Sequence, residues 1–240
     1  MKLLVNGCSV TRGDELTSDV LPESIEDKIY REKHVWGGQL AQKLNLSEYN
    51  NIAERGSSNK RILRTTIEYI ATLSEVERSD LLVIIGWSQI SRTEIYFQKK
   101  WRQVLPNFLT YFINHEFHAI EDFCQRYMMD DLPCHELFFT YVVSLQSFLK
   151  SNNINYFFLS FFPIDWTIST DFDHIINGID HNTFLYHNSK RNIRKVIHTE
   201  AKQRGYDTEL LVKPKQHPSE LGHSLIAEVL YNELQIRNII

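Results

Sequence analysis

A serine near the N-terminus and a histidine near the C-terminus are the side chains best suited to chemistry. Ser9 follows an apolar run and a glycine, and His217 precedes Pro218 just before the last apolar-periodic segment. A serine hydroxyl is a weak nucleophile until a base removes its proton, and an imidazole with a pKa near ~6.5 can do so at neutral pH. The pair therefore predicts attack on a carbonyl, with Ser9 as nucleophile and His217 as general base.

Such a reaction also needs hydrogen-bond donors for the oxygen that becomes negatively charged. The candidates are the backbone N–H groups of Ser9 and Gly56 and the hydroxyl of Ser88. Glycine at position 56 would let the backbone approach the substrate closely. Each residue has a structural alternative. Ser9 and Ser88 could simply form turns after strands, Gly56 could be an ordinary loop glycine, and His217 could only mark a helix start before Pro218.

These residues lie at the ends of predicted elements. Apolar runs predict buried strands at 2–5, 49–53, 81–86, 155–162 and 209–212. Helical periodicity separates them, and an aromatic-rich segment at about 96–151 predicts a helical insertion after the third strand. Strands that alternate with helices indicate a parallel sheet covered on both faces, with its chemistry at the carboxyl ends of the strands. We expect residues 1–240 to form a single domain.

Composition limits the classes of partner. The net charge is -4, so there is no general basic field, and we expect neither nucleic-acid nor membrane binding. Three widely spaced cysteines argue against a disulfide framework and favour a reducing compartment. The N-terminus lacks a secretory apolar region, and no stretch approaches the ~20 apolar residues that span a bilayer. These features predict a cytoplasmic protein.

Metal binding has one weak candidate, the cluster of His115, Glu116, His118 and Asp122. This spacing is not His-Glu-x-x-His, and no distant third ligand is evident. We expect no metal and no organic cofactor.

Taken together, the motifs resemble those of the SGNH (GDSL-type) serine hydrolases. Gly7-Cys8-Ser9 stands where that family has Gly-Asp-Ser, and Gly56 stands at its loop glycine. Gly86-Trp87-Ser88 replaces Gly-x-Asn, so a serine hydroxyl would substitute for an amide donor. His217 matches the Asp-x-x-His block, but Pro214 occupies the position of its aspartate. The chain thus keeps the nucleophile and the base and lacks the usual orienting acid.

The resemblance implies an α/β, three-layer α/β/α flavodoxin-like fold with a five-stranded parallel sheet in the order 2-1-3-4-5. It implies a serine esterase that hydrolyses a small acyl ester, such as acetyl on a carbohydrate-like substrate, through an acyl-Ser9 intermediate. Asp165, after the fourth predicted strand, is the candidate for orienting His217. It could instead be an exposed loop aspartate, which would leave a Ser–His dyad. Trp87, Arg92 and Asn59 are the candidate substrate-binding residues, although Arg92 could instead form a surface ion pair with Glu94 or Asp80.

Alternatives remain for the function. Pro214 and Ser88 favour a binding or interaction protein that keeps the SGNH scaffold without turnover. Cys8 could compete as nucleophile, but its side chain is expected to point into the core. A small-molecule or carbohydrate ester is the expected partner, and the sequence leaves a homo-oligomer open. The motifs and the Asn- and Ile-rich composition also resemble SGNH-like proteins of tailed bacteriophages, which would place the protein in the host cytoplasm.

Overall fold

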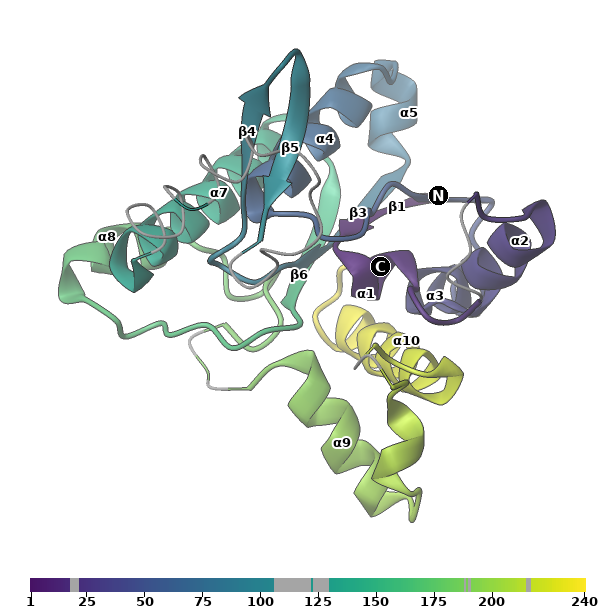
Figure 1. Ribbon diagram of the computed structural model, residues 1–240. Coiled ribbons are helices and arrows are strands. Elements are labelled where there is room, and N and C mark those ends of the chain that lie inside the picture. The colour runs from purple at the N-terminus through teal and green to yellow at the C-terminus, as the bar shows by residue number, and fades with distance from the viewer. Residues whose placement is uncertain (18–21, 106–121, 123–129, 188, 190, 215–216) are drawn as a thin grey trace.

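A parallel four-stranded sheet forms the centre of the molecule in a computed structural model, which describes residues 1–17, 22–105, 122, 130–187, 189, 191–214 and 217–240 (Figure 1). The strand order is β2-β1-β3-β6. The strands are β1 (Lys2–Gly7), β2 (Glu48–Asn51), β3 (Leu81–Trp87) and β6 (Asn155–Ser160). Since all four run parallel, the loops that follow them meet at one edge.

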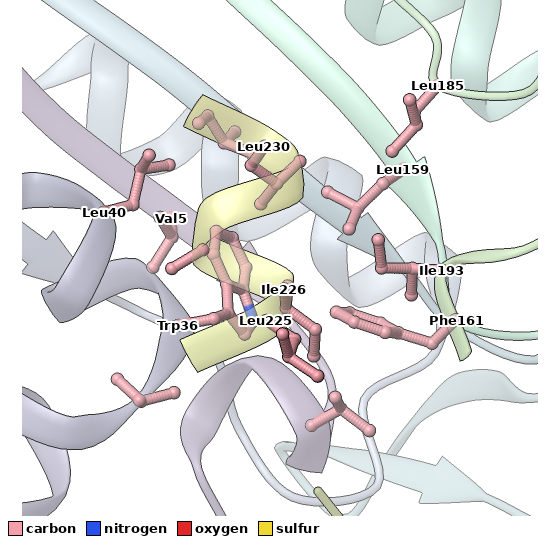
Figure 2. Packing of buried hydrophobic residues seen from close by; sticks show 14 of the residues in the cluster. Val5, Trp36, Leu40, Leu159, Phe161, Leu185, Ile193, Leu225, Ile226 and Leu230 are labelled. Carbon is pink, nitrogen blue, oxygen red and sulfur yellow. The ribbon is translucent and has the colours of Figure 1, made fainter. Parts of the chain in front are cut away.

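Alternating apolar side chains build a core on each face of this sheet. Leu3 and Val5 of β1 face one way and Leu4 faces the other, as period-two strands require. The first face packs against α3 (Trp36–Lys43), α9 (Ile193–Gln203) and α10 (Glu220–Ile236) (Figure 2). The second face packs against α4 (Asn59–Ala71) and α7 (Asp131–Ser151). The three-layer α/β/α arrangement is therefore present.

Shorter elements complete the described chain. They are α1 (Ser9–Arg12), α2 (Ile25–His34), α5 (Glu75–Ser79), η1 (Thr170–Phe172), α8 (Asp173–Ile176) and η2 (Thr208–Leu211). Serine side chains accept hydrogen bonds at the N-termini of the helices nearest the site, Ser58 for α4 and Ser219 for α10. None of the helices in the described ranges has the length and apolar character needed to cross a membrane.

The predicted helical insertion at 96–151 is wrong at its beginning. Antiparallel strands β4 (Thr93–Phe97) and β5 (Lys100–Val104) form a hairpin there. Its two turn residues, Gln98 and Lys99, both have positive φ, as a two-residue type I′ hairpin turn requires. Asn and Gly are the residues usually found in such a turn, and neither is present here. The helix α7 confirms the end of the predicted insertion, and most of residues 106–129 lies outside the described residues.

The fifth predicted strand is also wrong. The segment at 209–212 is mostly the 3-10 helix η2, whose start is capped by the Asp207 side chain. Beyond β6, only a single parallel bridge from Phe158 to Phe184 continues the sheet in the described residues. The four observed strands follow the first four places of the predicted order, because β6 is the fourth predicted strand.

Candidate active site

Ser9 lies where the sheet edge and a short helix meet. β1 ends at Gly7, which pairs in register with Gly86 of β3, and α1 begins at Ser9. A Cβ on Gly7 would lie 2.8 Å from the carbonyl oxygen of Gly86, and one on Gly86 would lie 2.5 Å from the hydroxyl of Thr11. Only glycine at both positions lets α1 sit this close to the sheet. Ser9 is 7% exposed, while Cys8 is fully buried in the core, as expected.

His217 is held by a carboxylate that the sequence analysis missed. Its Nδ1 lies 2.8 Å from Oε2 of Glu15, and its backbone N–H donates to the same oxygen at 3.2 Å. The glutamate side chain is 10% exposed and the imidazole 22%. Because a carboxylate only accepts hydrogen bonds, Nδ1 is the donor in this contact, and in a neutral imidazole Nε2 then holds the lone pair. This arrangement suits a general base.

Contacts between described residues hold the chain on both sides of His217. The backbone of Lys213 donates to the carbonyl of His217 at 2.8 Å, and Val212 bridges Pro218 in antiparallel fashion. Pro214 is exposed in the turn between them, so the position of the family's aspartate points to solvent-accessible surface. The described geometry therefore supplies the carboxylate from the other side, at Glu15.

Asp14 joins the Ser9 helix to the loop that contains Gly56. Its carboxylate is almost fully buried and accepts from Arg12 at 2.5 Å and from Arg55 at 2.6 Å. Its backbone N–H donates to the carbonyl of Ser9 at 3.0 Å. Two consecutive acidic residues thus serve the two halves of the site, since Asp14 fixes the Gly56 loop and Glu15 holds the imidazole.

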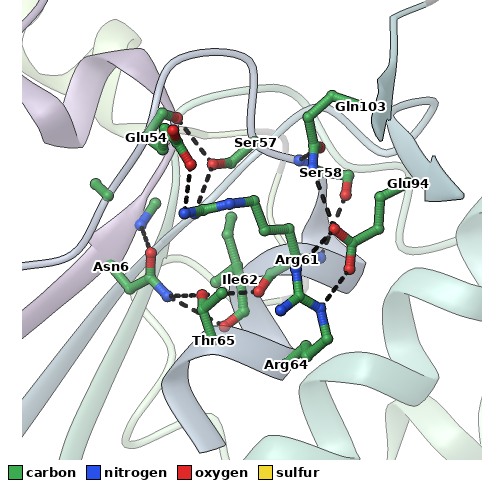
Figure 3. Close-up of polar contacts among 12 residues, drawn as sticks. Asn6, Glu54, Ser57, Ser58, Arg61, Ile62, Arg64, Thr65, Glu94 and Gln103 are labelled. Carbon is green, nitrogen blue, oxygen red and sulfur yellow. Dashed lines mark hydrogen bonds and ion pairs between the residues drawn. The ribbon is translucent and has the colours of Figure 1, made fainter. Parts of the chain in front are cut away.

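The Gly56 loop is braced on its other side as well. Arg61 pairs with Glu54 at 2.5 Å, and the backbone of Ser58 donates to Gln103 of β5 at 2.8 Å (Figure 3). Gly56 has φ +73°, a conformation that side chains rarely adopt. No hydrogen bond within the described ranges uses the backbone N–H of Gly56 or of Ser9. Both predicted donors are therefore available for a ligand oxygen.

Ser88, the third predicted donor, is buried and already makes hydrogen bonds to other residues. It is 1% exposed, and its backbone N–H donates to Oδ1 of Asn59 at 2.8 Å. The Asn59 amide in turn donates to the carbonyl of Ser88 at 3.2 Å. The Ser88 hydroxyl accepts from Arg92 at 3.1 Å, which leaves its own proton for another acceptor. Both ends of the Asn59 side chain are occupied, so this residue positions Ser88, and the geometry argues against its predicted substrate-binding role.

Two further predicted site residues lie elsewhere. Trp87 is fully buried, with its ring against Phe138 and Phe158, and has no surface to offer a substrate. The Asp165 carboxylate accepts from the backbone and hydroxyl of Thr167, and its backbone N–H donates to His135. Asp165 thus contacts Thr167 and His135, whereas Nδ1 of His217 contacts Glu15.

The described part of the chain lacks both a direct hydrogen bond between Ser9 and His217 and a cluster of metal ligands. None of the contacts found among the described residues is a hydrogen bond from the Ser9 hydroxyl to His217. The described ranges also contain no group of three or more His, Cys, Asp and Glu that could hold a metal ion. The weak metal candidate at 115–118 lies outside the described residues. Among the described residues, the site therefore consists of serine, histidine, carboxylate and backbone donors.

Solved structures with a similar fold are esterases. The psychrotrophic esterase EstA from Pseudoalteromonas is 10% identical with a TM-score of 0.51, over 98% of this chain and 97% of that one. A family 2 carbohydrate esterase from Corynascus thermopiles (Myceliophthora fergusii) is 12% identical with a TM-score of 0.52, over 99% and 66% of the two chains. Identities this low show a shared fold. The comparison with curated proteins finds no match.

A family model places the sequence more directly. It matches residues 15–185, which is more than half of the chain and begins at Glu15. The matched part contains the Gly56 loop, Ser88 and Arg92, whereas Ser9 and His217 lie outside it. The chain has an α/β fold that resembles that of the SGNH hydrolases. By the match to its family model, it belongs to the family of unknown function DUF6071.

Proposed function

We propose that the protein is a serine esterase in which Ser9 is the nucleophile, His217 the general base and Glu15 the carboxylate that orients the base. The observation that carries this proposal is the 2.8 Å contact between Glu15 Oε2 and His217 Nδ1. A carboxylate on one imidazole nitrogen fixes the tautomer in which the other nitrogen accepts a proton, and it stabilises the imidazolium that forms. Such a contact is what the missing Asp-x-x-His aspartate would otherwise provide.

The mechanism is acyl transfer in two steps. His217 Nε2 removes the proton of Ser9 as the hydroxyl oxygen attacks the ester carbonyl, and the protonated imidazole then protonates the departing alcohol. Water attacks the acyl-Ser9 ester with the same base, which releases the acid and restores the serine. Binding of the ester must bring Ser9 and His217 within hydrogen-bond distance, because catalytic hydrogen bonds are often long before substrate binds.

Three donors support the negative charge on the carbonyl oxygen in this proposal. The unused backbone N–H groups of Ser9 and Gly56 are two of them, and the Ser88 hydroxyl proton is the third. Preplaced donors of this kind contribute about 3–4 kcal/mol each to lowering the barrier of acyl transfer. The expectation of an acetyl group on a carbohydrate-like substrate stays part of the proposal.

Ser9→Ala tests the nucleophile. We expect wild-type protein to react with a fluorophosphonate probe at Ser9, located by peptide mass spectrometry, and to hydrolyse para-nitrophenyl acetate. The variant should lose both reactions while its melting temperature stays nearly unchanged, since the Ser9 hydroxyl makes no hydrogen bond to another described residue. Ser57→Ala is a matched control, because Ser57 lies in the Gly56 loop without a proposed reactive role. Labelling that persists in Ser9→Ala would contradict the mechanism.

A second candidate function is a binding protein on the same scaffold. It is favoured by the burial of Ser88, which is 1% exposed, and by the lack of a Ser9–His217 hydrogen bond within the described part of the chain. The same labelling experiment separates the two functions. Folded wild-type protein that neither reacts with the probe nor hydrolyses esters would favour the binding protein.

A further inference from the structure

Among the described residues, Arg92 is a cation without a carboxylate partner, next to the proposed site. Its guanidinium donates to the Ser88 hydroxyl at 3.1 Å and lies over the Phe162 ring, 5.4 Å from the centroid. The described residues place no acidic side chain in an ion pair with it. The anticipated partners are engaged elsewhere, Glu94 with Arg64 and Asp80 with the N-terminal amine.

The arginines around it behave differently. Arg12 and Arg55 both pair with Asp14, and Arg61 pairs with Glu54. A guanidinium presents five N–H donors in a planar fork and cannot lose its charge in a protein. Arg92 uses one of its terminal nitrogens for Ser88, so most of its donors remain for an anion. The Ser91 hydroxyl in the same turn is buried and has no hydrogen-bond partner within the described chain.

The register of the sheet places this cation relative to the nucleophile. Gly7 pairs with Gly86 and Trp87 pairs with Ser160, so Ser9, Ser88 and Phe162 follow three adjacent strands at the same edge. Adjacent strands are about 4.8 Å apart. Arg92, which contacts Ser88 and Phe162, therefore lies roughly one to two strand spacings, or about 5–10 Å, from Ser9. That distance corresponds to a few covalent bonds of an extended substrate.

We propose that Arg92 determines specificity for esters that carry a carboxylate a few bonds from the scissile carbonyl, on either the acyl or the alcohol side. This inference rests on the proposed esterase function. A planar carboxylate fits the guanidinium fork with two parallel hydrogen bonds, which a neutral chain of the same length cannot form. The ring of Phe162 holds one face of the guanidinium and so limits its movement.

The experiment compares two pairs of esters. On the acyl side, para-nitrophenyl hexanoate is compared with the mono-para-nitrophenyl ester of adipic acid. On the alcohol side, hexyl acetate is compared with the acetyl ester of hydroxyhexanoic acid. We expect wild-type kcat/KM to be about 10- to 100-fold higher for the anionic member of at least one pair, as for a charge-assisted hydrogen bond. Arg92→Met should remove this preference, so that the variant hydrolyses the charged and neutral members of the pair with kcat/KM values within about threefold of each other.

Two further variants sharpen the result. Arg92→Lys should retain part of the preference, because an ammonium keeps the charge without the fork. Arg237→Met is the matched control. Arg237 also lies over a phenylalanine ring, 5.6 Å from the centroid of Phe157, and it follows the C-terminal end of α10. The substitution removes the same net charge and should leave the preference intact.

Binding to the Ser9→Ala variant separates this inference from the esterase proposal. We expect calorimetry to show binding of the adipate ester that the additional Arg92→Met substitution weakens about 10- to 100-fold. Arg92-dependent binding without turnover by wild type would contradict the esterase and support the anion site. Equal rates on both members of both pairs, or an Arg92→Met loss that is equal for charged and neutral esters, would overturn the inference.

Discussion

At the residue scale, Glu15 combines a contact to His217 with an unusual backbone conformation. It is a non-glycine residue with φ +68°, in the left-handed region. Such a backbone costs of order 1 kcal/mol and persists only where the surroundings impose it. Here the Asp14 ion pairs fix the preceding residue, and two hydrogen bonds from His217 fix the carboxylate. The left-handed backbone conformation and the contact to the imidazole therefore occur at the same residue.

Glu15→Gln tests the orienting carboxylate. We expect the variant to fold normally and kcat to fall by about 10²- to 10⁴-fold, because an amide permits the wrong imidazole tautomer and cannot stabilise imidazolium. Asp165→Asn is the matched control and should change kcat by less than about threefold. The measurement is steady-state hydrolysis of para-nitrophenyl acetate, with circular dichroism to check the fold. The reverse ranking of the two variants would restore Asp165 as the acid.

Residue types and spacing were enough to identify Ser9 and His217 as candidates. They were not enough to identify Glu15, the carboxylate that contacts His217. Glu15 and His217 are 202 positions apart, and nothing in the sequence distinguishes Glu15 from its acidic neighbour Asp14. Only the backbone turn after α1 decides which of the two faces His217. The signal that could have directed attention there was a pair of acidic residues directly after a glycine, close to the nucleophile.

At the element scale, the hairpin β4–β5 depends on one buried charge pair. The Glu94 side chain is fully buried and accepts from Arg64 of α4 at 2.9 and 3.0 Å (Figure 3). Arg64 also lies 4.6 Å from the centroid of Trp101 on β5. The pair therefore fixes the hairpin to the helix that follows the Gly56 loop.

Arg64→Met should destabilise the protein by about 2 kcal/mol. Removing one partner of a buried pair leaves an uncompensated charge and costs about 3–5 kcal/mol, and we reduce this figure because Arg64 is 24% exposed. The double variant Arg64→Met, Glu94→Gln should recover part of the loss, since no charge is then left buried. Urea unfolding of wild type, Arg64→Met, Glu94→Gln and the double variant measures the coupling. Additive losses would show that the two side chains act independently.

The sequence predicted the buried strands and missed the hairpin for different physical reasons. β3 reads as a continuous apolar run because both faces of a central parallel strand are covered. β4 and β5 contain charged and aromatic residues, and their partner is the α4 surface, so their pattern does not distinguish strand from helix. Their turn lacks glycine and asparagine, which removed the remaining local signal.

At the scale of the whole molecule, the order of the central strands was predicted from the resemblance to the SGNH hydrolases, and the four observed strands follow it. The prediction of a fifth strand was wrong. In the described chain only an isolated bridge, between Phe158 and Phe184, continues the sheet beyond β6. The expectations of a single domain and of a bacteriophage origin stay predictions. Long-range contacts such as Trp36 with His223, 187 positions apart, bring the N- and C-terminal parts of the chain into one core.

That contact gives the whole molecule a defined response to acid. His223 is completely buried, and its Nδ1 accepts from the backbone of Trp36 at 3.3 Å. Burial, with a smaller effect of nearby His217, lowers the pKa of His223 to about 3. In the unfolded chain the pKa returns to about 6.5, so below that pH the unfolded state binds a proton that the folded state does not. The stabilisation is complete above pH ~6.5 and is lost as the pH falls toward 3.

His223→Asn separates this effect from every other acid-sensitive group. Asparagine keeps an acceptor near the position of Nδ1 but does not titrate, so the comparison cancels the contribution of the surface carboxylates. We expect the free energy of unfolding of wild type to fall by about 2 kcal/mol more than that of the variant between pH 7 and pH 5, a slope approaching 1.4 kcal/mol per pH unit. Urea unfolding at half-unit pH steps gives both curves. Parallel curves for the two proteins over this range would show that His223 is not the buried neutral group that couples the stability of this core to pH.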